Sequence, residues 1–310
     1  MMDSTLQRVD GQEPHKCSSP MLRTLFELTI ISLISLCRSM QRVPSNGISL
    51  AYESHGSGHP LILIGGLAYG AWVWHKVVPE LAKHVRVIAF DNRGAGESDK
   101  PEGPYTAPMM AADTLGLMDA LDISSAYVLG ISMGGFIAQE IALTQPQRVD
   151  KLILAATHYG GLDAIPPPPE AMQVMTDRSG DITELLLRGF RISTAPNFPE
   201  QHPEIIQELL EYRLPQPVPP AQYAAQVQVG LRHNASERLS QIQCPTLIVF
   251  GEHDNVVPKE NAQLLAKKIP HAEIKILPNA GHLLPIESPN VLGQMVIEFL
   301  KQEKGAKKGK

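Results

Sequence analysis

Short apolar runs recur along the chain from residue 48 to residue 277. The first alternates apolar and polar positions, and most of the later ones are almost continuously apolar, which is typical of strands buried on both faces of a parallel sheet. We expect strands over 48–52, 60–64, 85–90, 126–129, 151–156, 246–250 and 273–277. Between them, helical spacing of apolar residues predicts helices over 71–83, 109–121, 133–144, 263–269 and 291–300. Strands that alternate with helices predict an α/β fold with a mostly parallel sheet flanked by helices.

One stretch, residues 158–240, interrupts this alternation because it contains no convincing strand. It has four consecutive prolines and then helical patterns, near 170–176, 182–190, 203–213 and 220–231. A helical insertion over the strand ends of such a sheet would cover a pocket. We therefore expect a core made of residues 41–157 and 241–302, with residues 158–240 as a helical cap.

The two ends of the chain differ from the rest. Residues 1–40 are expected to form an N-terminal extension, in which the apolar-rich residues 22–37 are too short and too interrupted for a membrane span. Three interpretations stay open. Residues 1–40 are a nonfunctional extension or one that is not native, with the true start at Met40; they contain a weak signal or membrane anchor; or they form an extra helix packed on the domain as part of a lid. Residues 303–310 are expected to be a Lys-rich solvated tail.

The amino-acid composition argues against nucleic-acid binding, a disulfide framework and a metal site. The chain has 310 residues, of which 43% are hydrophobic, so it can bury a sizeable core, and its formal net charge of -5 offers no basic field for nucleic acid. Its three cysteines match neither a disulfide framework nor a metal site. We expect no metal and no cofactor, a monomer or homodimer, and a cytoplasmic location, unless residues 22–37 direct secretion or membrane anchoring.

The strongest chemical signal is the pentapeptide of residues 130–134, Gly-Ile-Ser-Met-Gly, which fits the pattern G-x-S-x-G. A predicted strand precedes it and a predicted helix follows, as in a nucleophile elbow, where the serine occupies a strained turn and its neighbours must lack side chains. This context, more than the motif itself, predicts that Ser132 is a nucleophile.

A serine hydroxyl needs a base, and in this arrangement a carboxylate and then a histidine follow along the chain. Asp254 follows the strand 246–250, and His282 follows the strand 273–277, so both are expected at the edge of the sheet that holds Ser132. Glu252 and His253 are rivals to Asp254 as the partner of the base. We expect His282 to take the Ser132 proton and Asp254 to orient the imidazole.

An oxyanion hole requires two backbone N–H donors. The residue after the nucleophile, Met133, supplies one, and the loop after the strand 60–64 supplies the other, which we assign to Leu67. Neither donor depends on its side chain.

Together these motifs resemble the α/β-hydrolase superfamily, close to carboxylesterases and 3-oxoadipate enol-lactonase-like enzymes. The shared features are Gly65-Gly66, residues 91–98 (Asp-Asn-Arg-Gly-Ala-Gly-Glu-Ser), the Ser132 elbow, residues 251–254 and Gly281-His282. The resemblance covers most of residues 45–300 and implies an α/β-hydrolase fold with an eight-stranded type of sheet. One departure is Gly65-Gly66, where the family usually has His-Gly. Residues 91–98 are expected to shape a turn, and Glu287 is expected to be a loop residue.

The pocket is expected to be apolar, which suits a neutral ester of short or medium chain length. Its candidate lining residues are Ala68, Trp72, His158, Val256, Val257 and Leu283. We expect a serine carboxylesterase that works through an acyl-enzyme. Two alternatives stay open: an enol-lactonase or C–C bond hydrolase on a carboxylated substrate, for which Arg188 and Arg191 are candidate anion ligands, and a non-catalytic small-molecule receptor on the same fold.

Overall fold

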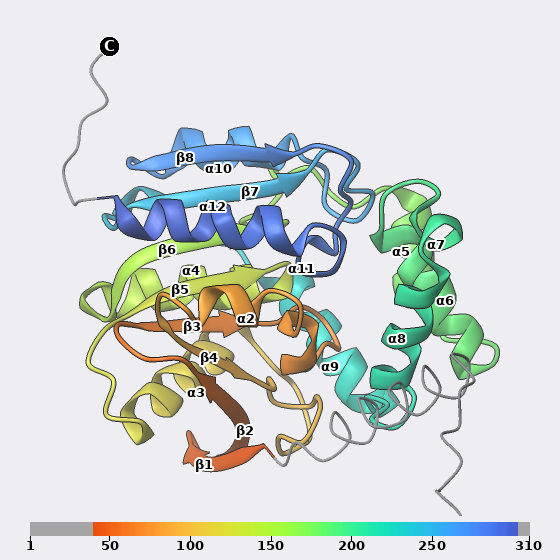
Figure 1. Ribbon diagram of the computed structural model, residues 1–310, viewed down its shortest axis with the longest axis horizontal. Helices are drawn as coiled ribbons and strands as arrows, with labels where there is room; N and C mark the ends of the chain where they lie inside the picture. The colour runs from red at the N-terminus through yellow and green to blue at the C-terminus, as the bar shows by residue number, and fades with distance from the viewer. Residues whose placement is uncertain (1–39, 303–310) are drawn as a thin grey trace, which may run out of the picture. The chain divides into compact units, whose positions relative to one another are not determined.

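The computed structural model describes residues 40–302 (Figure 1). The predictions of an N-terminal extension over 1–40, of a signal over 22–37 and of a Lys-rich tail over 303–310 therefore fall outside the described residues, apart from Met40. Within residues 40–302, no helix combines the length and the apolar character that crossing a membrane requires.

Eight strands within the described range form one sheet in the order β1-β2-β4-β3-β5-β6-β7-β8. The first two, β1 (Gln41–Ser45) and β2 (Ile48–His55), pair antiparallel, and β2 is also antiparallel to β4. The remaining pairs are parallel and involve β3 (Pro60–Ile64), β4 (Arg86–Phe90), β5 (Ala126–Ile131), β6 (Val149–Ala155), β7 (Thr246–Gly251) and β8 (Ala272–Leu277). The predicted mostly parallel α/β sheet is confirmed.

The sequence pattern missed β1. Its five residues are mostly exposed, include Pro44 and show no apolar alternation. Such a composition is normal at a sheet edge, where proline and charge discourage pairing with another chain. The pairing of Gln41 with Tyr52 on β2 defines the strand, and a window of sequence does not reveal it.

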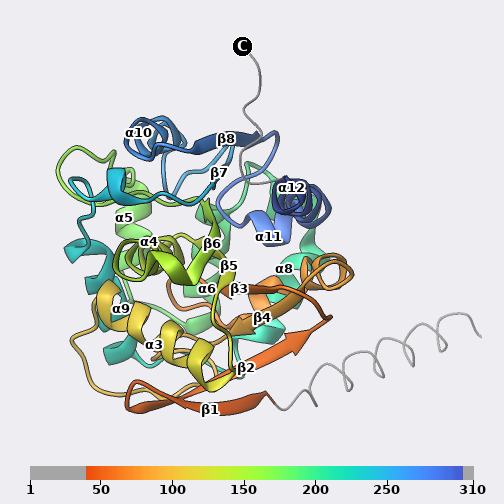
Figure 2. The same ribbon diagram turned by 90° about the vertical axis from the view of Figure 1, so that its left-hand side faces the viewer.

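Helices cover both faces of the sheet (Figure 2). One face carries α3 (Ala107–Ala120), α4 (Met133–Thr144) and α10 (Asn261–Lys268), and the other carries α2 (Val78–Leu81) and α12 (Pro289–Lys301). Successive residues of β3 serve the two cores in turn, because strand side chains alternate: Ile62 and Ile64 join the first core, and Leu61 and Leu63 join the second.

The helix predicted over 71–83 is wrong as a single element. The structure has a 3-10 helix, η1 (Ala71–Trp74), and then the short α2. Pro79 lies at the start of α2, and its missing N–H cannot continue a helix that began a turn earlier. Four further short pieces escaped the pattern: η2 (Pro146–Arg148), α7 (Phe198–Gln201), η3 (Leu239–Gln241) and α11 (Leu284–Glu287).

The segment between β6 and β7 contains helices and no strand. Its helices are α5 (Pro169–Thr176), α6 (Ile182–Ser193), α7 (Phe198–Gln201), α8 (Pro203–Arg213) and α9 (Pro220–Arg232). In Figure 1, α5 to α8 lie beyond the ends toward which β5 and β7 point. We call residues 158–240 the insertion, since the described strands stop on either side of it.

Candidate active site

Ser132 lies in the turn that joins β5 to α4. Its backbone angles, φ 54° and ψ -121°, fall in a region that side chains rarely adopt and that costs about 1–3 kcal/mol. The flanking glycines make the turn feasible: a Cβ on Gly130 would lie 2.2 Å from the Gly134 carbonyl oxygen, and a Cβ on Gly134 would lie 2.2 Å from the Ile64 carbonyl oxygen. The turn therefore presents the serine at the N-terminus of α4, where the helix dipole favours negative charge.

His282 and Asp254 form a buried pair beside this turn. The loops after β7 and β8 carry them, and His282 Nδ1 lies 2.9 Å from Asp254 Oδ2 and 3.1 Å from Asp254 Oδ1. The N–H groups of Val256 and Val257 donate to Asp254 Oδ1 at 2.9 and 2.8 Å, which fixes the carboxylate. With Nδ1–H donating to the carboxylate, Nε2 keeps the lone pair that a base needs. Ser132 and His282 line the same cavity.

The two other candidates for the partner of His282, Glu252 and His253, lie nearer the surface. Glu252 and His253 are about two-fifths exposed, at 44% and 42%, and interact with each other across 3.8 Å. Asp254, in contrast, has no exposed side-chain surface. Of the three candidates considered from the sequence, Asp254 is the one that contacts His282.

Glu287 holds the histidine loop, a contact that the sequence did not reveal. Its carboxylate accepts hydrogen bonds from the backbone N–H groups of Gly281 and Leu283, on both sides of His282, and from Ala195 of the insertion. Burial raises the pKa of the Glu287 carboxyl, and these N–H donors oppose that shift. The Ser193 carbonyl oxygen accepts the N–H groups of His282 and Leu283, each at 2.9 Å, so the insertion also contacts this loop directly.

The predicted oxyanion loop, which follows β3, lies against Ser132. A Cβ on Gly66 would lie 3.3 Å from the Ser132 Cβ, which measures how closely the loop approaches. Among residues 40–302, no acceptor takes the backbone N–H of Leu67 or that of Met133. The Gly65 carbonyl oxygen accepts a hydrogen bond from Asn92 Nδ2 at 3.0 Å, so an asparagine ties down the loop in which Gly65-Gly66 replaces the usual His-Gly.

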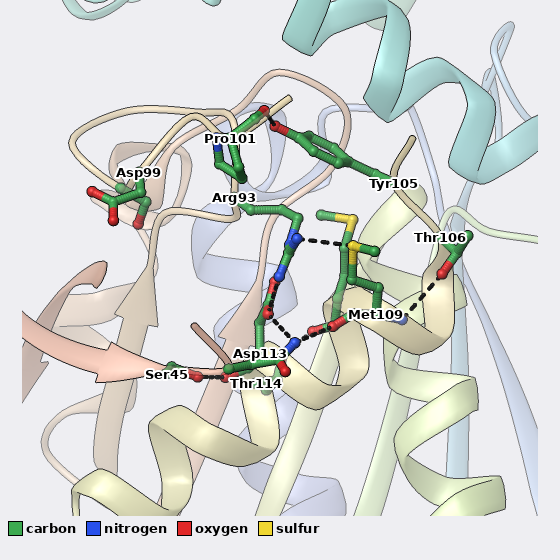
Figure 3. Close-up of polar contacts among 12 residues, drawn as sticks. Ser45, Arg93, Asp99, Pro101, Tyr105, Thr106, Met109, Asp113 and Thr114 are labelled. Carbon is green, nitrogen blue, oxygen red and sulfur yellow. Dashed lines mark hydrogen bonds and ion pairs between the residues drawn. The ribbon is translucent and has the colours of Figure 1, made fainter. Parts of the chain in front are cut away.

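The same loop is linked to the insertion through Gln226. Gln226 Oε1 accepts the N–H of Ala68 at 2.8 Å, and Gln226 Nε2 donates to the Arg93 carbonyl oxygen at 2.8 Å. The Arg93 guanidinium forks onto Asp113, with both side chains buried (Figure 3). Ser45 Oγ donates to the Asp113 carbonyl oxygen at 2.6 Å. Arg93 belongs to residues 91–98 and Asp113 belongs to α3, so this ion pair attaches the 91–98 turn to the helix, which is a structural contribution.

Two cavities meet at Ser132. The smaller, of about 110 Å³, is also lined by His282, and the larger, of about 290 Å³, is also lined by Met133. The expected pocket residues divide between them: Ala68 and Leu283 line the smaller, His158 and Val257 line the larger, and Val256 lines both.

Trp72 is the exception among the expected pocket residues, because it lines neither cavity. Its ring stacks on Tyr212, with centroids 5.2 Å apart and planes at 3°. The tryptophan joins the loop after β3 to α8, so its contribution is packing.

His158 brings a polar edge to the larger cavity. The Gly160 N–H donates to His158 Nδ1 at 2.9 Å, so this nitrogen carries no proton and Nε2 carries one. Burial lowers the pKa of the His158 imidazole to about 4, so the ring is neutral at ordinary pH. A neutral imidazole N–H can orient a polar substrate atom without introducing a charge.

The arginines proposed from the sequence do not line these cavities. Arg188 pairs with Asp177 at 3.1 Å, and the side chain of Arg191 is 70% exposed. Arg178 and Arg213 line the smaller cavity instead. Helical patterning in the sequence does not show which arginines of this segment face the cavities, because Arg178 follows the end of α5 and Arg213 is the last residue of α8, where the periodicity stops. Within the described residues, no cluster of three or more His, Cys, Asp or Glu could hold a metal ion.

Comparison with known proteins agrees with this architecture. The family model for the alpha/beta hydrolase fold matches residues 59–289. The chain is 29% identical over 252 residues to the poly(3-hydroxyalkanoate) depolymerase of Ectopseudomonas oleovorans, covering 79% of this chain and 85% of that protein. It is 30% identical over 279 residues to the 2-hydroxy-6-oxo-2,4-heptadienoate hydrolase of Pseudomonas putida, covering 84% and 96%.

A solved structure shows the same likeness. The enol-lactonase from Burkholderia xenovorans LB400 superposes with a TM-score of 0.74 at 26% identity, covering 84% of this chain and all of that one. The resemblance drawn from the sequence motifs, including its enol-lactonase-like branch, is thereby confirmed. The match to the family model spans well over half of the sequence, and the chain belongs to the alpha/beta hydrolase family.

Proposed function

We propose that this protein is a serine hydrolase that cleaves carboxylic esters through an acyl-enzyme on Ser132. The observation that carries the proposal is the shared cavity of Ser132 and His282, with Asp254 hydrogen-bonded to the far side of the imidazole. A nucleophile, a base and an orienting carboxylate in this relation are the requirements of acyl transfer.

The reaction follows from these positions. His282 Nε2 takes the Ser132 hydroxyl proton as Oγ bonds to the ester carbonyl carbon, and the backbone N–H groups of Leu67 and Met133 stabilise the oxyanion. The bond from carbon to the alcohol oxygen then breaks, and that oxygen receives the proton from His282. A water molecule, deprotonated by His282, attacks the acyl-enzyme, which releases the carboxylic acid and frees Ser132.

The larger cavity supports a short- to medium-chain acyl group. Its volume of about 290 Å³ lies at the low end of ordinary ligand pockets, roughly 300–1,000 Å³. Phe136, Val257 and Met172 give it apolar walls. A long acyl chain would have to extend into solvent.

Enol-lactone or C–C bond cleavage is the second candidate, since relatives named for such reactions share this family. A panel of nitrophenyl esters graded by acyl length separates the two. Hydrolysis of butanoyl and hexanoyl esters that is lost in Ser132→Ala supports the ester hydrolase, and a wild-type enzyme inert toward the whole panel contradicts it.

A non-catalytic receptor on the same fold is the third candidate. A fluorophosphonate reacts with an activated serine and not with an inert one. Stoichiometric labelling of the wild type, absent in Ser132→Ala, supports catalysis, whereas a wild type that resists labelling supports the receptor. Thr144→Val is the matched control, because its hydroxyl donates within α4 to the Glu140 carbonyl oxygen, away from both cavities.

A further inference from the structure

The smaller cavity contains two positive charges without a counter-ion. Arg178, in the segment after α5, and Arg213, the last residue of α8, both line it together with Ser132 and His282. Within residues 40–302, no carboxylate lies in ion-pair distance of either guanidinium. Most other arginines in the described part of the chain have a carboxylate partner, as Arg93 has in Asp113.

The groups that do contact these arginines are aromatic and neutral. The Arg178 guanidinium carbon lies 4.1 Å from the centre of the Tyr223 ring, and that of Arg213 lies 5.3 Å from the centre of the Tyr69 ring. Burial raises the pKa of the Tyr69 hydroxyl to about 12 and also raises that of Tyr223. Both phenols therefore stay protonated and supply no negative charge. Ring faces support and orient a guanidinium and leave its N–H edge available for a ligand.

The two arginines also repel one another. Arg178 is exposed, and Arg213 is partly buried. Burial lowers the pKa of the Arg213 guanidinium, and the charge of Arg178 lowers it further. A partly buried charge without a partner, such as Arg213, is unfavourable, and an anion beside the two guanidinium groups would offset their repulsion and accept hydrogen bonds from them. Two guanidinium groups that line one cavity, with no carboxylate partner among the described residues, favour the binding of an anion.

The position of His282 shows which part of an ester would reach this site. His282 lines the smaller cavity and not the larger one, whereas Met133 lines the larger one. Because His282 returns the proton to the departing alcohol oxygen, the alcohol portion must occupy the smaller cavity. The acyl portion then lies in the larger, mostly apolar cavity.

We infer that the smaller cavity binds a carboxylate on the alcohol portion of the substrate, held by Arg213 and Arg178, so that the preferred substrates are apolar acyl esters of short hydroxy acids. This rests on the proposed ester hydrolysis and adds its substrate class. The reaction is unchanged: the acyl group passes to Ser132 Oγ, and the hydroxy acid leaves with the proton from His282.

Three butanoyl or butyl esters test the inference. In 4-(butanoyloxy)butanoate the carboxylate is on the alcohol side, in 4-(butanoyloxy)butanamide the same position is neutral, and in monobutyl glutarate the carboxylate is on the acyl side. We expect the wild type to hydrolyse the first with a kcat/KM about tenfold or more above the second, from charge-assisted hydrogen bonds. No preference for the acid over the amide, or a preference for monobutyl glutarate, overturns the inference.

Variants separate recognition from folding. We expect Arg213→Met to bring the acid-to-amide ratio of kcat/KM close to one, and Arg213→Lys to restore part of it, because lysine keeps the charge but loses the planar fork. Arg178→Met should lower the ratio less, since this side chain is more exposed. The control is Arg188→Met, which removes an arginine paired with Asp177 outside the cavities. If Arg213→Met folds and lowers both rates equally, Arg213 is structural and the inference is wrong.

A binding experiment distinguishes failure of the subsite from failure of the proposed reaction. Calorimetry with Ser132→Ala measures binding of 4-(butanoyloxy)butanoate without turnover, alone and combined with Arg213→Met. A wild type that hydrolyses no ester, beside Arg213-dependent binding, refutes the hydrolysis and supports the subsite. Ester hydrolysis without Arg213-dependent binding refutes the subsite and leaves the hydrolysis standing.

Discussion

Replacement of Asp254 by asparagine isolates the chemical contribution of the carboxylate, because the structure determines how the amide must lie. The N–H groups of Val256 and Val257 both donate to Oδ1, so the asparagine oxygen has to stay there. Its NH₂ group then faces His282 Nδ1 in place of Oδ2, which lies 2.9 Å away in the wild type. The NH₂ donates to Nδ1, and the imidazole proton moves to Nε2, the nitrogen that must accept the Ser132 proton.

The expected loss follows from two terms. To regain the active tautomer, the imidazole proton must return to Nδ1, where this N–H faces the N–H of the asparagine amide in a buried site. In addition, the imidazolium formed in the reaction loses its charge-assisted hydrogen bond to the carboxylate. Together these two effects cost about 3–6 kcal/mol. At about 1.36 kcal/mol per tenfold change, kcat should fall roughly 10²–10⁴-fold. Thermal unfolding should change little, because the oxygen keeps both backbone N–H groups.

Single-turnover acylation by nitrophenyl butanoate provides the assay, with circular dichroism as the check on folding. Glu252→Gln is the matched control: it removes a carboxylate two residues away that is 44% exposed and does not touch His282. The assignment is refuted if the Asp254→Asn enzyme acylates within about threefold of the wild-type rate, or if Glu252→Gln reduces acylation by more than Asp254→Asn does.

Three further changes probe the elbow, the turn and the histidine loop. Gly134→Ala would place Cβ 2.2 Å from the Ile64 carbonyl oxygen and should destabilise the fold by about 3 kcal/mol or more in chemical unfolding, whereas Gly189→Ala, with no atom within 4 Å, should stabilise it slightly. Burial raises the pKa of Asp91 from 3.8 to about 6, so the protonated carboxyl stabilises the folded state fully below about pH 4, and this stabilisation is lost as the pH rises through 6. The unfolding free energy of Asp91→Asn should therefore rise relative to that of the wild type by up to about 3 kcal/mol between pH 4 and 7. A difference between the two proteins that stays constant with pH would contradict this. Glu287→Gln should lower kcat about tenfold with little change in KM, because its amide cannot accept all three backbone N–H groups, and an unchanged kcat would show that the loop holds without them.

Local sequence patterns predicted the part of the fold that is internally buried. The strands 60–64 and 126–129 are continuous apolar runs because both of their faces are covered, and the structure has them as β3 and β5. β1 escaped because an edge strand is defined by its partner and not by its own composition. The helix over 71–83 failed because periodicity alone outweighed Pro79 in the prediction.

The candidate site also has a part that the sequence predicted and a part that it did not. Ser132, Asp254 and His282 each follow a strand of one parallel sheet, so their common edge could be foreseen from strand order. The contacts of Glu287 and Gln226 could not, because each joins segments far apart in the chain through side-chain atoms that no periodicity encodes. The signal that the sequence offered for Glu287 was an acidic residue shortly after His282, but the sequence does not show that its side chain is buried.

The insertion forms hydrogen bonds to the loop that carries His282 and to the loop that follows β3. If the proposed function holds, these contacts relate substrate choice to reactivity. Through Ser193 and Ala195 it bonds to the histidine loop, and through Gln226 it bonds to the oxyanion loop at Ala68. The same insertion supplies Arg213 to the smaller cavity. In the proposed reaction, a substrate bound by the insertion would therefore act on the two loops that hold His282 and the proposed oxyanion donor Leu67. Interactions with a part of the substrate far from the reacting bond can in this way stabilise the transition state, so that they raise kcat as well as lower KM.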